Sequence, residues 1–577
     1  MIKLIGSRYC HTDAGYFSKV EGGRNPRRRP GVVCGVCCIL ALSALVSVPL
    51  SVFADEANRL LREQRDQDHR TLEQLRELPD TQIDYPRLEE PAESASGTCF
   101  DISELTITGA TQLTDDERLA AEAMVVGACV GLNEINRLIR FITNLYIEKG
   151  LVTTRAYIPS QDLSTGRLEI LVLEGRVEGV EESSGRGELN IDTAFPGVTG
   201  ELFDLRDFEQ GLDQINRLPS NNARLQIEPG SKPGMTRVMI HNEASRRWRA
   251  RAALDNYNGD EKLDLHYSID NPLALNDLLS VTASHSYADT ASDSLSLFWS
   301  VPYGYWLYTT MASYFDYRGT IEGLTQNLTT EGDSVTLRTE AQRVLFRTRK
   351  GRLDLVAGLQ YRDTENLIEE VLLEVSSPTL STWDLAMNWT LPLGNGVFQW
   401  HLGLVNGIGA FGATKGGETE ESAHGRFRSY ETRLTYSHPF RAGDTRAVFV
   451  SDLTAQSSDV PLYGSQQLSL TGFWAVRAVQ GSSVAADRGL YWRNELSVSL
   501  PIERSDARAR FFFALDYGRT NERFGEPDRK LTGVAVGING AWRQLGYNLV
   551  VADLYDQREL IDIDEDPVIY AQLSWSL

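Results

Sequence analysis

The sequence predicts a transmembrane β-barrel of sixteen antiparallel strands, preceded by two small α/β modules and an N-terminal helix. Three observations predict this fold class. Segments of about ten residues alternate apolar and polar side chains through residues 246–577, the connections between them are alternately short and long, and an apolar leader indicates export. A hydrophobic content of 42% with a mean hydropathy of −0.28 excludes a polytopic helical membrane protein.

The leader has the three parts of a secretory signal. Several arginines in residues 24–29 precede an apolar segment from Val32 to Ala54, which ends in Val52-Phe53-Ala54. We therefore predict a signal peptide over residues 1–54 with cleavage after Ala54. The alternative is an uncleaved anchor, which the acidic residues directly after Ala54 disfavour. The stretch before the arginines is long, so an extended signal and a misassigned start codon both stay open.

A helix and a linker are predicted next. Residues 55–78 lack glycine and proline and are rich in Glu, Gln, Arg and Leu, which favours a helix of about 36 Å. Its apolar stripe is thin, so we expect water on most sides of the helix. The stripe consists of Leu60, Leu61, Leu72, Leu75 and Leu78. Three prolines among acidic and small residues predict an extended linker over residues 79–98.

Two tandem α/β modules are predicted at residues 99–175 and 176–245. In the first, a helix from Asn133 to Lys149 has apolar residues at helical spacing and stops at Gly150. The second repeats the alternation of strands and helices, and Phe208 and Leu212 lie on one face of its main helix. Small sheets of this kind bind peptides by strand addition at their edges.

Two cysteines remain after the predicted cleavage site. Cys99 and Cys129 both lie in the first module, and the other four cysteines precede Ala54. In an exported chain, two cysteines favour a disulfide over a metal site, which needs three or four ligands. Closing a loop of this length stabilises a domain by about 3 to 4 kcal/mol.

The alternation of polarity predicts the individual strands of the barrel. It is clearest in Leu353–Arg362, Ser381–Leu391 and Ile569–Leu577. The predicted strands begin near Trp248, Lys262, Leu278, Asp293, Trp306, Ser334, Arg352, Ser381, Val397, Ser429, Thr445, Leu490, Ala509, Leu531, Gly546 and Pro567.

The connections indicate how this barrel would lie in a membrane. Those after even strands are tight, whereas most of those after odd strands are longer, and the longest is Ser457–Gly489. Outer-membrane barrels have short periplasmic turns and long outer loops, which places the helix, the linker and both modules in the periplasm. A soluble β-sandwich, the alternative for alternating strands, does not require this asymmetry.

Motifs in both modules match a known family. The runs at residues 99–110, 150–157 and 174–177 resemble its first polypeptide-transport-associated (POTRA) module, and residues 205–220 resemble its second. The chain thus resembles the outer-membrane transporters of two-partner secretion, the haemolysin activation and secretion proteins, over essentially the whole mature sequence. The resemblance implies that residues 55–78 form a plug helix and that a long sixth loop folds into the pore.

The same resemblance predicts a lock inside the pore. The family's sixth loop bears a Val-Arg-Gly-aromatic motif, which reads Val476-Arg477-Ala478-Val479 here, so the shape of the loop tip stays open. Phe513, Asp516 and Gly518 resemble the family's partner motif in the barrel wall. The alternation independently turns Asp516 toward the lumen. We predict that Arg477 and Asp516 pair as a pore lock. The alternative is a solvated arginine and an ordinary lumen aspartate.

The resemblance implies a function. The chain is expected to recognise an unfolded secreted exoprotein of the haemolysin or adhesin type in the periplasm of a Gram-negative bacterium and to move it to the cell surface. Outer-membrane lipid and lipopolysaccharide, periplasmic chaperones and the barrel-assembly machinery are further expected partners. Alternatives are an insertase of the barrel-assembly superfamily and a passive porin-like channel. We predict a partner-binding groove beside the helix and strand of the second module, at Phe208, Leu212, Ile215, Arg217, Leu225 and Ile227.

Other functions find little support. The net charge of −22 argues against a nucleic-acid partner. Residues 407–412 match a dinucleotide fingerprint but lead into a loop instead of a helix. The histidines are scattered without metal-ligand spacing, and no nucleophile-base motif is present. We therefore expect no cofactor, no metal and no enzymatic activity, and the oligomeric state stays open.

Overall fold

The structure is a computed structural model that describes residues 50–577, apart from short segments. These are 78, 80, 82, 84, 86, 90–97, 184–188, 288–290, 322–326, 417–421, 481–483, 501, 503–505, 522–527 and 559–565. Most of the predicted signal therefore lies outside the described residues. No helix in the described part of the chain is long and apolar enough to cross a membrane.

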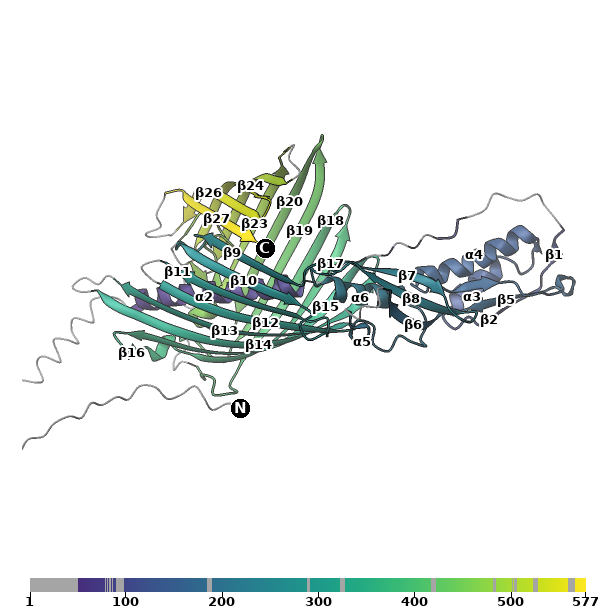
Figure 1. Cartoon of the computed structure of the whole chain (residues 1–577), viewed down its shortest axis with the longest axis horizontal. Coiled ribbons are helices and arrows are strands. Elements are labelled where there is room, and N and C mark those ends of the chain that lie inside the picture. Colours follow the sequence, from purple (N-terminus) through teal and green to yellow (C-terminus); the bar gives the residue numbers. More distant parts are fainter. Residues whose placement is uncertain are drawn as a thin grey trace, which may run out of the picture. The chain divides into compact units, whose positions relative to one another are not determined.

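Helix α2, Leu50–Arg76, corresponds to the predicted plug helix and runs among the barrel strands (Figure 1). It begins before the predicted cleavage site and ends two residues before the predicted end. The expectation that water surrounds most of it was wrong. Leu60 and Leu61 are buried against Phe315 and Tyr317 of the barrel, and Leu72 is buried against other wall residues. Even a thin apolar stripe docks when the wall supplies a matching surface.

The first module contains a three-stranded sheet, in the order β2-β5-β4, covered by two helices. Its elements are β1 Phe100–Asp101, β2 Glu104–Thr108, α3 Asp115–Ala123, β3 Cys129–Val130, α4 Leu132–Glu148, β4 Arg155–Tyr157, η2 Leu163–Thr165 and β5 Arg167–Leu173. Thr114 and Glu117 form a capping box that starts α3. Gly150, with φ of 91°, follows α4 in a conformation that favours glycine.

The second module repeats this plan with the sheet order β6-β8-β7. Its elements are β6 Arg176–Glu182, α5 Ile191–Ala194, α6 Leu205–Asn216, β7 Ala223–Pro229 and β8 Met235–Asn242. The ring of Phe208 on α6 lies 5.5 Å from Phe195 and 4.7 Å from Phe203 between ring centroids. The helix therefore packs its apolar face onto the sheet and closes the core of the module.

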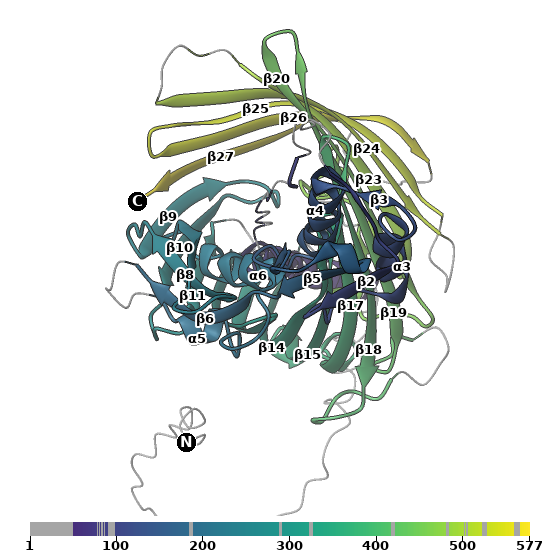
Figure 2. The ribbon, with the colours of Figure 1, turned by 90° about the vertical axis from the view of Figure 1, so that its right-hand side faces the viewer.

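Sixteen antiparallel strands close into the predicted barrel, and β27 pairs with β9 where the wall closes (Figure 2). They are β9 Trp248–Asp255, β10 Lys262–Asp270, β11 Leu278–Ser286, β12 Ala291–Tyr303, β13 Trp306–Ile321, β14 Leu328–Thr348, β15 Gly351–Ile368, β17 Thr379–Leu393, β18 Gly396–Ile408, β19 Arg428–Ala442, β20 Thr445–Ser458, β23 Arg488–Ser499, β24 Ala507–Thr520, β25 Lys530–Trp542, β26 Leu545–Arg558 and β27 Val568–Ser576. The short strand β16, Val371–Leu372, pairs only with the end of β15, and η3, Glu374–Ser376, follows it.

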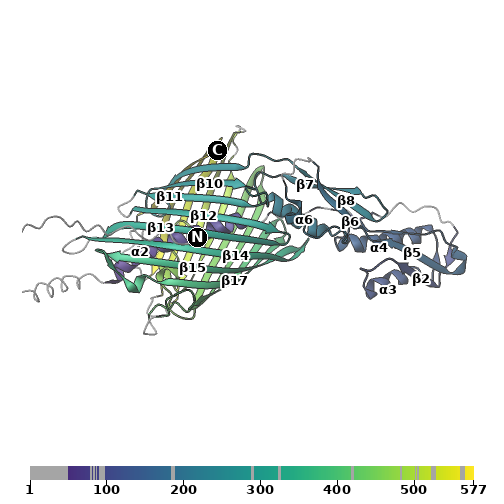
Figure 3. The same ribbon diagram turned by 60° about the horizontal axis from the view of Figure 1, so that its bottom comes forward.

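The two faces of the strands decide between a barrel and a sandwich. Along β17, Trp383, Leu385 and Met387 are exposed, whereas the intervening Asp384 and Ala386 are buried. Figure 3 shows neighbouring strands of this wall following one another in chain order. Apolar side chains therefore point away from the lumen, as in a barrel that faces lipid.

Candidate functional site in the barrel lumen

The connection between β20 and β23, residues 459–487, is called loop six here and fills part of the lumen. It contains η4 Gly464–Gln466, β21 Leu468–Ser469 and β22 Ala485–Ala486. Val476 and Val479 are fully buried against Leu531 of the barrel wall. The tip of loop six therefore packs on the inner surface of the barrel.

Arg477 of loop six lies against Asp516 of β24. The Arg477 Nε donates to Asp516 Oδ2 at 2.8 Å, and Nη2 donates to Oδ1 at 2.9 Å, which is a side-on pair of two parallel hydrogen bonds. The Arg477 backbone amide also donates to Oδ2, at 3.2 Å. Glu495 accepts from the third nitrogen, Nη1, at 2.8 Å. The structure thus places the two predicted residues in contact and adds Glu495.

Ala478 occupies the position where the family motif has glycine. A Cβ added at Gly533 would lie 2.5 Å from the Ala478 Cβ, and one added at Gly518 would lie 2.9 Å from a methyl carbon of Val476. Glycines on β24 and β25 therefore leave the space that these larger loop side chains occupy. The loop tip packs closely on the barrel wall because its larger side chains fit the space above these glycines.

Loop six also contacts both sides of the barrel seam. The Tyr570 hydroxyl on β27 donates to the Arg477 carbonyl at 2.8 Å. The Phe473 ring stacks on Tyr257, which follows β9, with centroids 3.9 Å apart. The Gln480 side chain donates to the carbonyl of Asn256 at 2.6 Å. Loop six therefore contacts the last strand, β27, and the residues that directly follow the first strand, β9.

The plug helix is held by loop six through backbone carbonyls. Arg62 donates to the carbonyl of Gly464 at 3.1 Å, and Arg65 donates to those of Ser465 and Gln467 at 3.0 and 3.1 Å. The sequence did not predict this contact, because carbonyl acceptors carry no side-chain signature. Helix α2 and loop six therefore form one connected unit inside the barrel.

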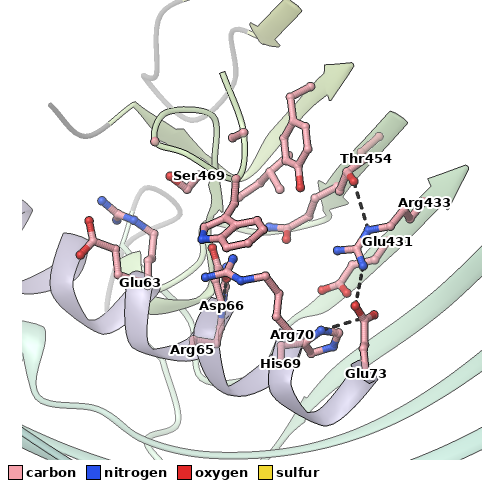
Figure 4. Close-up of a pocket in the computed structure, with 18 of the residues that line it drawn as sticks. Glu63, Arg65, Asp66, His69, Arg70, Glu73, Glu431, Arg433, Thr454 and Ser469 are labelled. Atoms are coloured by element: carbon pink, nitrogen blue, oxygen red, sulfur yellow. Dashed lines mark hydrogen bonds and ion pairs between the residues drawn. The ribbon is translucent and has the colours of Figure 1, made fainter. Parts of the chain in front are cut away.

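The plug also contacts the barrel wall directly, beside a cavity of about 500 Å³ that both Arg65 and Glu73 line (Figure 4). The Arg433 Nη1 on β19 lies 2.6 Å from Glu73 Oε2, and His69 Nδ1 lies 3.5 Å from Glu73 Oε1. Asp68 accepts hydrogen bonds from Ser296 at 2.9 Å and Ser313 at 2.8 Å. Polar and charged contacts thus add to the apolar contact of Leu72 with the wall, and a buried polar group can leave for water more readily than an apolar core can.

The predicted partner-binding residues lie elsewhere than in an open groove. Phe208, Leu212 and Ile215 are buried in the core of the second module. Leu225 and Ile227 on β7 are partly buried against that core. Direct contact of the three helix residues with a partner would require α6 to leave the sheet. Their partner-binding role stays a prediction.

Arg217, also predicted to bind the partner, is buried at the junction with the barrel. Its Nη1 donates to the Ser300 Oγ at 2.8 Å, and its Nη2 donates to the Asn276 carbonyl at 3.1 Å. Burial lowers the pKa of Arg217 to about 10, and the carboxylates of Asp270 and Asp277 oppose that shift. The side chain joins the second module to the barrel.

The polar face of α6 adds to this junction. The Tyr305 hydroxyl, in the turn between β12 and β13, donates to Asp207 at 2.7 Å, and the Gln214 amide donates to the carbonyls of Gly304 and Trp306. Burial raises the pKa of Asp207, and the hydrogen bond from Tyr305 opposes the rise. The polar residues on the face of α6 opposite its apolar stripe indicate that this helix has a second contact surface.

Cys99 and Cys129 form the predicted disulfide, with their Cα atoms 5.3 Å apart. Cys99 directly precedes β1, and Cys129 lies in β3 opposite Asp101. The described residues contain no cluster of His, Cys, Asp and Glu that could hold a metal ion.

Comparison with protein families finds three matches. Residues 234–540 match the haemolysin secretion/activation protein family ShlB/FhaC/HecB. Residues 100–175 match the ShlB-type POTRA domain, and residues 176–229 match another POTRA domain. The matches therefore run from the first module through most of the barrel.

Relatives match over most of the chain. It is 31% identical over 470 residues to the outer membrane transporter CdiB of Dickeya dadantii strain 3937, which covers 79% of this chain and 83% of the relative. It is 30% identical over 552 residues to the hemolysin transporter protein ShlB of Serratia marcescens, with 91% and 94% covered. The solved structure of CdiB from Escherichia coli has a TM-score of 0.80 at 27% identity and covers 91% of this chain and 98% of that one.

Proposed function

Because the chain belongs to the haemolysin secretion/activation protein family ShlB/FhaC/HecB, we propose that its plug and loop six form the gate through which a secreted partner passes. It is an outer-membrane transporter of two-partner secretion, with POTRA domains in the periplasm. Its family consists of transporters and not of enzymes. It acts with a secreted exoprotein.

One observation carries the gate proposal: the obstruction of the lumen consists of two pieces joined by polar contacts. Arg62 and Arg65 tie the plug to loop six, and Arg477 ties loop six to Asp516 on the wall. Hydrogen bonds that involve a charged group contribute a modest net free energy, about 1.5 to 3 kcal/mol each, because they exchange with hydrogen bonds to water. Such an obstruction closes the resting pore and yields to a partner.

Further partners follow from the setting and are part of the proposal. An unfolded exoprotein in the periplasm exposes apolar segments, so chaperones would keep it soluble before it reaches the POTRA domains. The apolar outer face of the barrel, with Trp383 and Leu385 exposed, would contact lipid and lipopolysaccharide. A barrel of this topology would itself need the barrel-assembly machinery for insertion.

Deleting the gene in its host tests the transport function. We expect one large exoprotein to disappear from the surface and medium while the other outer-membrane proteins keep their levels. Loss of many outer-membrane proteins would indicate an insertase instead. Complementation with a chain that lacks residues 99–243 should fail to restore secretion. Restored solute uptake by that shortened chain, with no effect on any exoprotein, would indicate a passive channel.

A further inference from the structure

The segment that follows the plug helix is docked along both POTRA domains. We call residues 79–89 the strap, of which the structure describes 79, 81, 83, 85 and 87–89. The strap begins three residues after α2 ends and leads toward the first POTRA domain. Any movement of the strap therefore acts directly on the end of the plug helix.

The strap meets α6 through its backbone amides. The Thr81 N–H donates to Asp213 Oδ1 at 2.9 Å, and the Ile83 N–H donates to Glu209 Oε1 at 2.8 Å. Both carboxylates are fully buried, and each also lies against Arg347 at the end of β14. A buried carboxylate needs several donors, and the strap supplies one to each.

The spacing of these contacts fits an extended chain of any sequence. Two residues of extended chain advance by about 6.6 Å, and the four residues from 209 to 213 advance by about 6 Å along a helix. Alternate amides of an extended segment therefore match carboxylates one turn apart. Because the donors are backbone amides, this match does not depend on the side chains of the segment.

Arginines from the barrel bind carbonyls of the same alternate residues of the strap. Arg352 donates to the carbonyl of Pro79 at 3.1 Å, Arg347 to that of Thr81 at 2.7 Å, and Arg349 to that of Tyr85 at 3.2 Å. Both the amide and the carbonyl groups along this edge of the strap therefore have partners, as in a strand added to the edge of a sheet.

The contact continues onto the first POTRA domain. Leu88 exchanges two hydrogen bonds with the Asn144 side chain, at 3.0 and 3.4 Å. The side chains of Ile83 and Tyr85 pack, partly buried, against the core of the second domain, and Arg155 donates to the Tyr85 hydroxyl at 2.9 Å. The surface thus accepts apolar groups at alternate positions, together with a run of backbone.

We infer that this surface, formed by Glu209 and Asp213 of α6 with Arg155 and Asn144, is the binding site for an extended segment of the unfolded partner, and that the strap fills it at rest. The inference rests on the proposed function and deepens it. A partner segment that displaces the strap detaches the C-terminal end of the plug helix from the POTRA domains. Recognition of cargo and release of the plug are then one event.

A peptide with the sequence of residues 79–89 tests the site in the full-length protein. The tethered strap competes at an effective concentration on the order of millimolar, so the wild-type chain should bind the labelled peptide weakly. The double variant Ile83→Ala/Tyr85→Ala loosens the strap, and the apparent Kd should fall at least about tenfold. Arg87→Ala, which removes an exposed ion pair of the strap with Glu148, is the matched control and should bind like the wild type.

Modified peptides test the backbone contacts without changing the protein. N-methylation of the amides at Thr81 and Ile83 removes both donors to α6 and should weaken binding to the double variant about tenfold or more. N-methylation at Arg87, whose amide reaches neither carboxylate, should leave the affinity unchanged. Equal affinity of the wild type and the double variant, or equally tight binding of a permuted peptide, would overturn the inference.

Single-channel recording tests the link to the plug. Excess peptide on the periplasmic side of a planar bilayer should increase openings of the wild-type pore, and the permuted peptide should not. Binding without any change in openings would overturn the coupling. Failure of the peptide experiments with secretion intact would refute only this inference, whereas normal secretion after gene deletion would refute the proposed function.

Discussion

Arg477 and Asp516 pair side-on inside the barrel, and both side chains are almost fully buried. Removing one member of such a pair leaves an uncompensated charge in a dry site, which costs more than the pair contributes when intact. Glu495 accepts a further hydrogen bond from Arg477 at 2.8 Å, so the arginine stays partly satisfied without Asp516. Asp516 nevertheless supplies both oxygens of the parallel pair and orients the loop tip.

Charge reversal at Asp516 should open the pore. Asp516→Lys places two cations in contact, and breaking a buried pair costs about 3 to 5 kcal/mol, with the lower end expected here because Glu495 remains. We expect channel openings in planar bilayers to become at least about tenfold more frequent. Asp516→Asn, which keeps the shape, should have a smaller effect in the same direction.

A surface pair near the end of the same strand provides the control. Arg519 and Asp528 form an ion pair at 3.0 Å in which both side chains are about half exposed. Exposed pairs contribute little, so Asp528→Lys should leave the conductance unchanged. Unchanged conductance in Asp516→Lys as well would contradict a locking role for the buried pair.

The ion pair between Glu73 and Arg433 should hold the C-terminal half of the plug helix against the barrel wall. Arg433→Glu turns attraction into repulsion, and a partly exposed pair is worth about 1 kcal/mol, or about fivefold in the ratio of open to closed pore. Combining it with Glu73→Arg should restore the wild-type conductance. If the charge-swapped chain conducts as much as Arg433→Glu alone, this contact does not hold the plug.

The order and phase of the barrel strands could be predicted because the pattern has a period of two. In β17, Trp383 and Asp384 fall on opposite faces simply because they are neighbours. The same phase turned Asp516 into the lumen, and the family motif supplied Arg477. Glu495 lies in a run, Tyr491–Glu495, that fits the family pattern, but its pairing with Arg477 was not predicted, and nothing local in β27 distinguishes Tyr570 from other lumen residues.

Contacts between segments that are distant in the sequence were harder to predict. An apolar helix face such as Phe208 with Leu212 has the same pattern whether a sheet or a partner covers it, so the period cannot tell a core from a groove. The thin stripe of Leu60 and Leu61 predicts a helix with water on most sides, because the matching Phe315 lies far away in the sequence. Strap contacts through backbone amides leave no trace in side-chain patterns.

Arg217 should stabilise the junction between the second POTRA domain and the barrel. Arg217→Ala removes hydrogen bonds to Ser300 and to a backbone carbonyl, and leaving buried acceptors unpaired costs about 1 to 3 kcal/mol. We expect faster hydrogen exchange in α6 and in the turn around Gly304. Arg237→Ala, which removes a more exposed pair with Glu178 in the same domain, should not change exchange there. Slow exchange in both variants would contradict the joining role.

Glu174 should make the first POTRA domain sensitive to acid. Burial acts to raise the pKa of Glu174, but hydrogen bonds from Thr111, Tyr146 and backbone amides outweigh it and hold the pKa below the ordinary 4.5. A lowered pKa stabilises the fold above pH 4.5, and this contribution is lost as the pH falls through the folded value. Urea-dependent pepsin cleavage of the full chain, between about pH 3 and pH 6, should show this loss.

Glu174→Gln removes the titrating group and tests the assignment. The variant should lose part of the pH dependence of the first domain, whereas Glu104→Gln, at an exposed pair with Arg167, should retain it. Glu174→Ala should also destabilise the domain at neutral pH by about 1 to 3 kcal/mol, because the buried Tyr146 hydroxyl loses its acceptor. Identical pH profiles for wild type and Glu174→Gln would contradict this account.

The disulfide should matter for partner capture through the stability of the first POTRA domain. Cys99→Ser/Cys129→Ser reopens a loop of 30 residues, which should destabilise the domain by about 3 kcal/mol. Urea-dependent proteolysis of the full chain should show a lower midpoint for this domain and an unchanged barrel. The bond also fixes the strand β1 into which the linker leads, so the downstream end of the strap should become more protease-sensitive. An unchanged midpoint would mean that the helices α3 and α4 alone hold the domain.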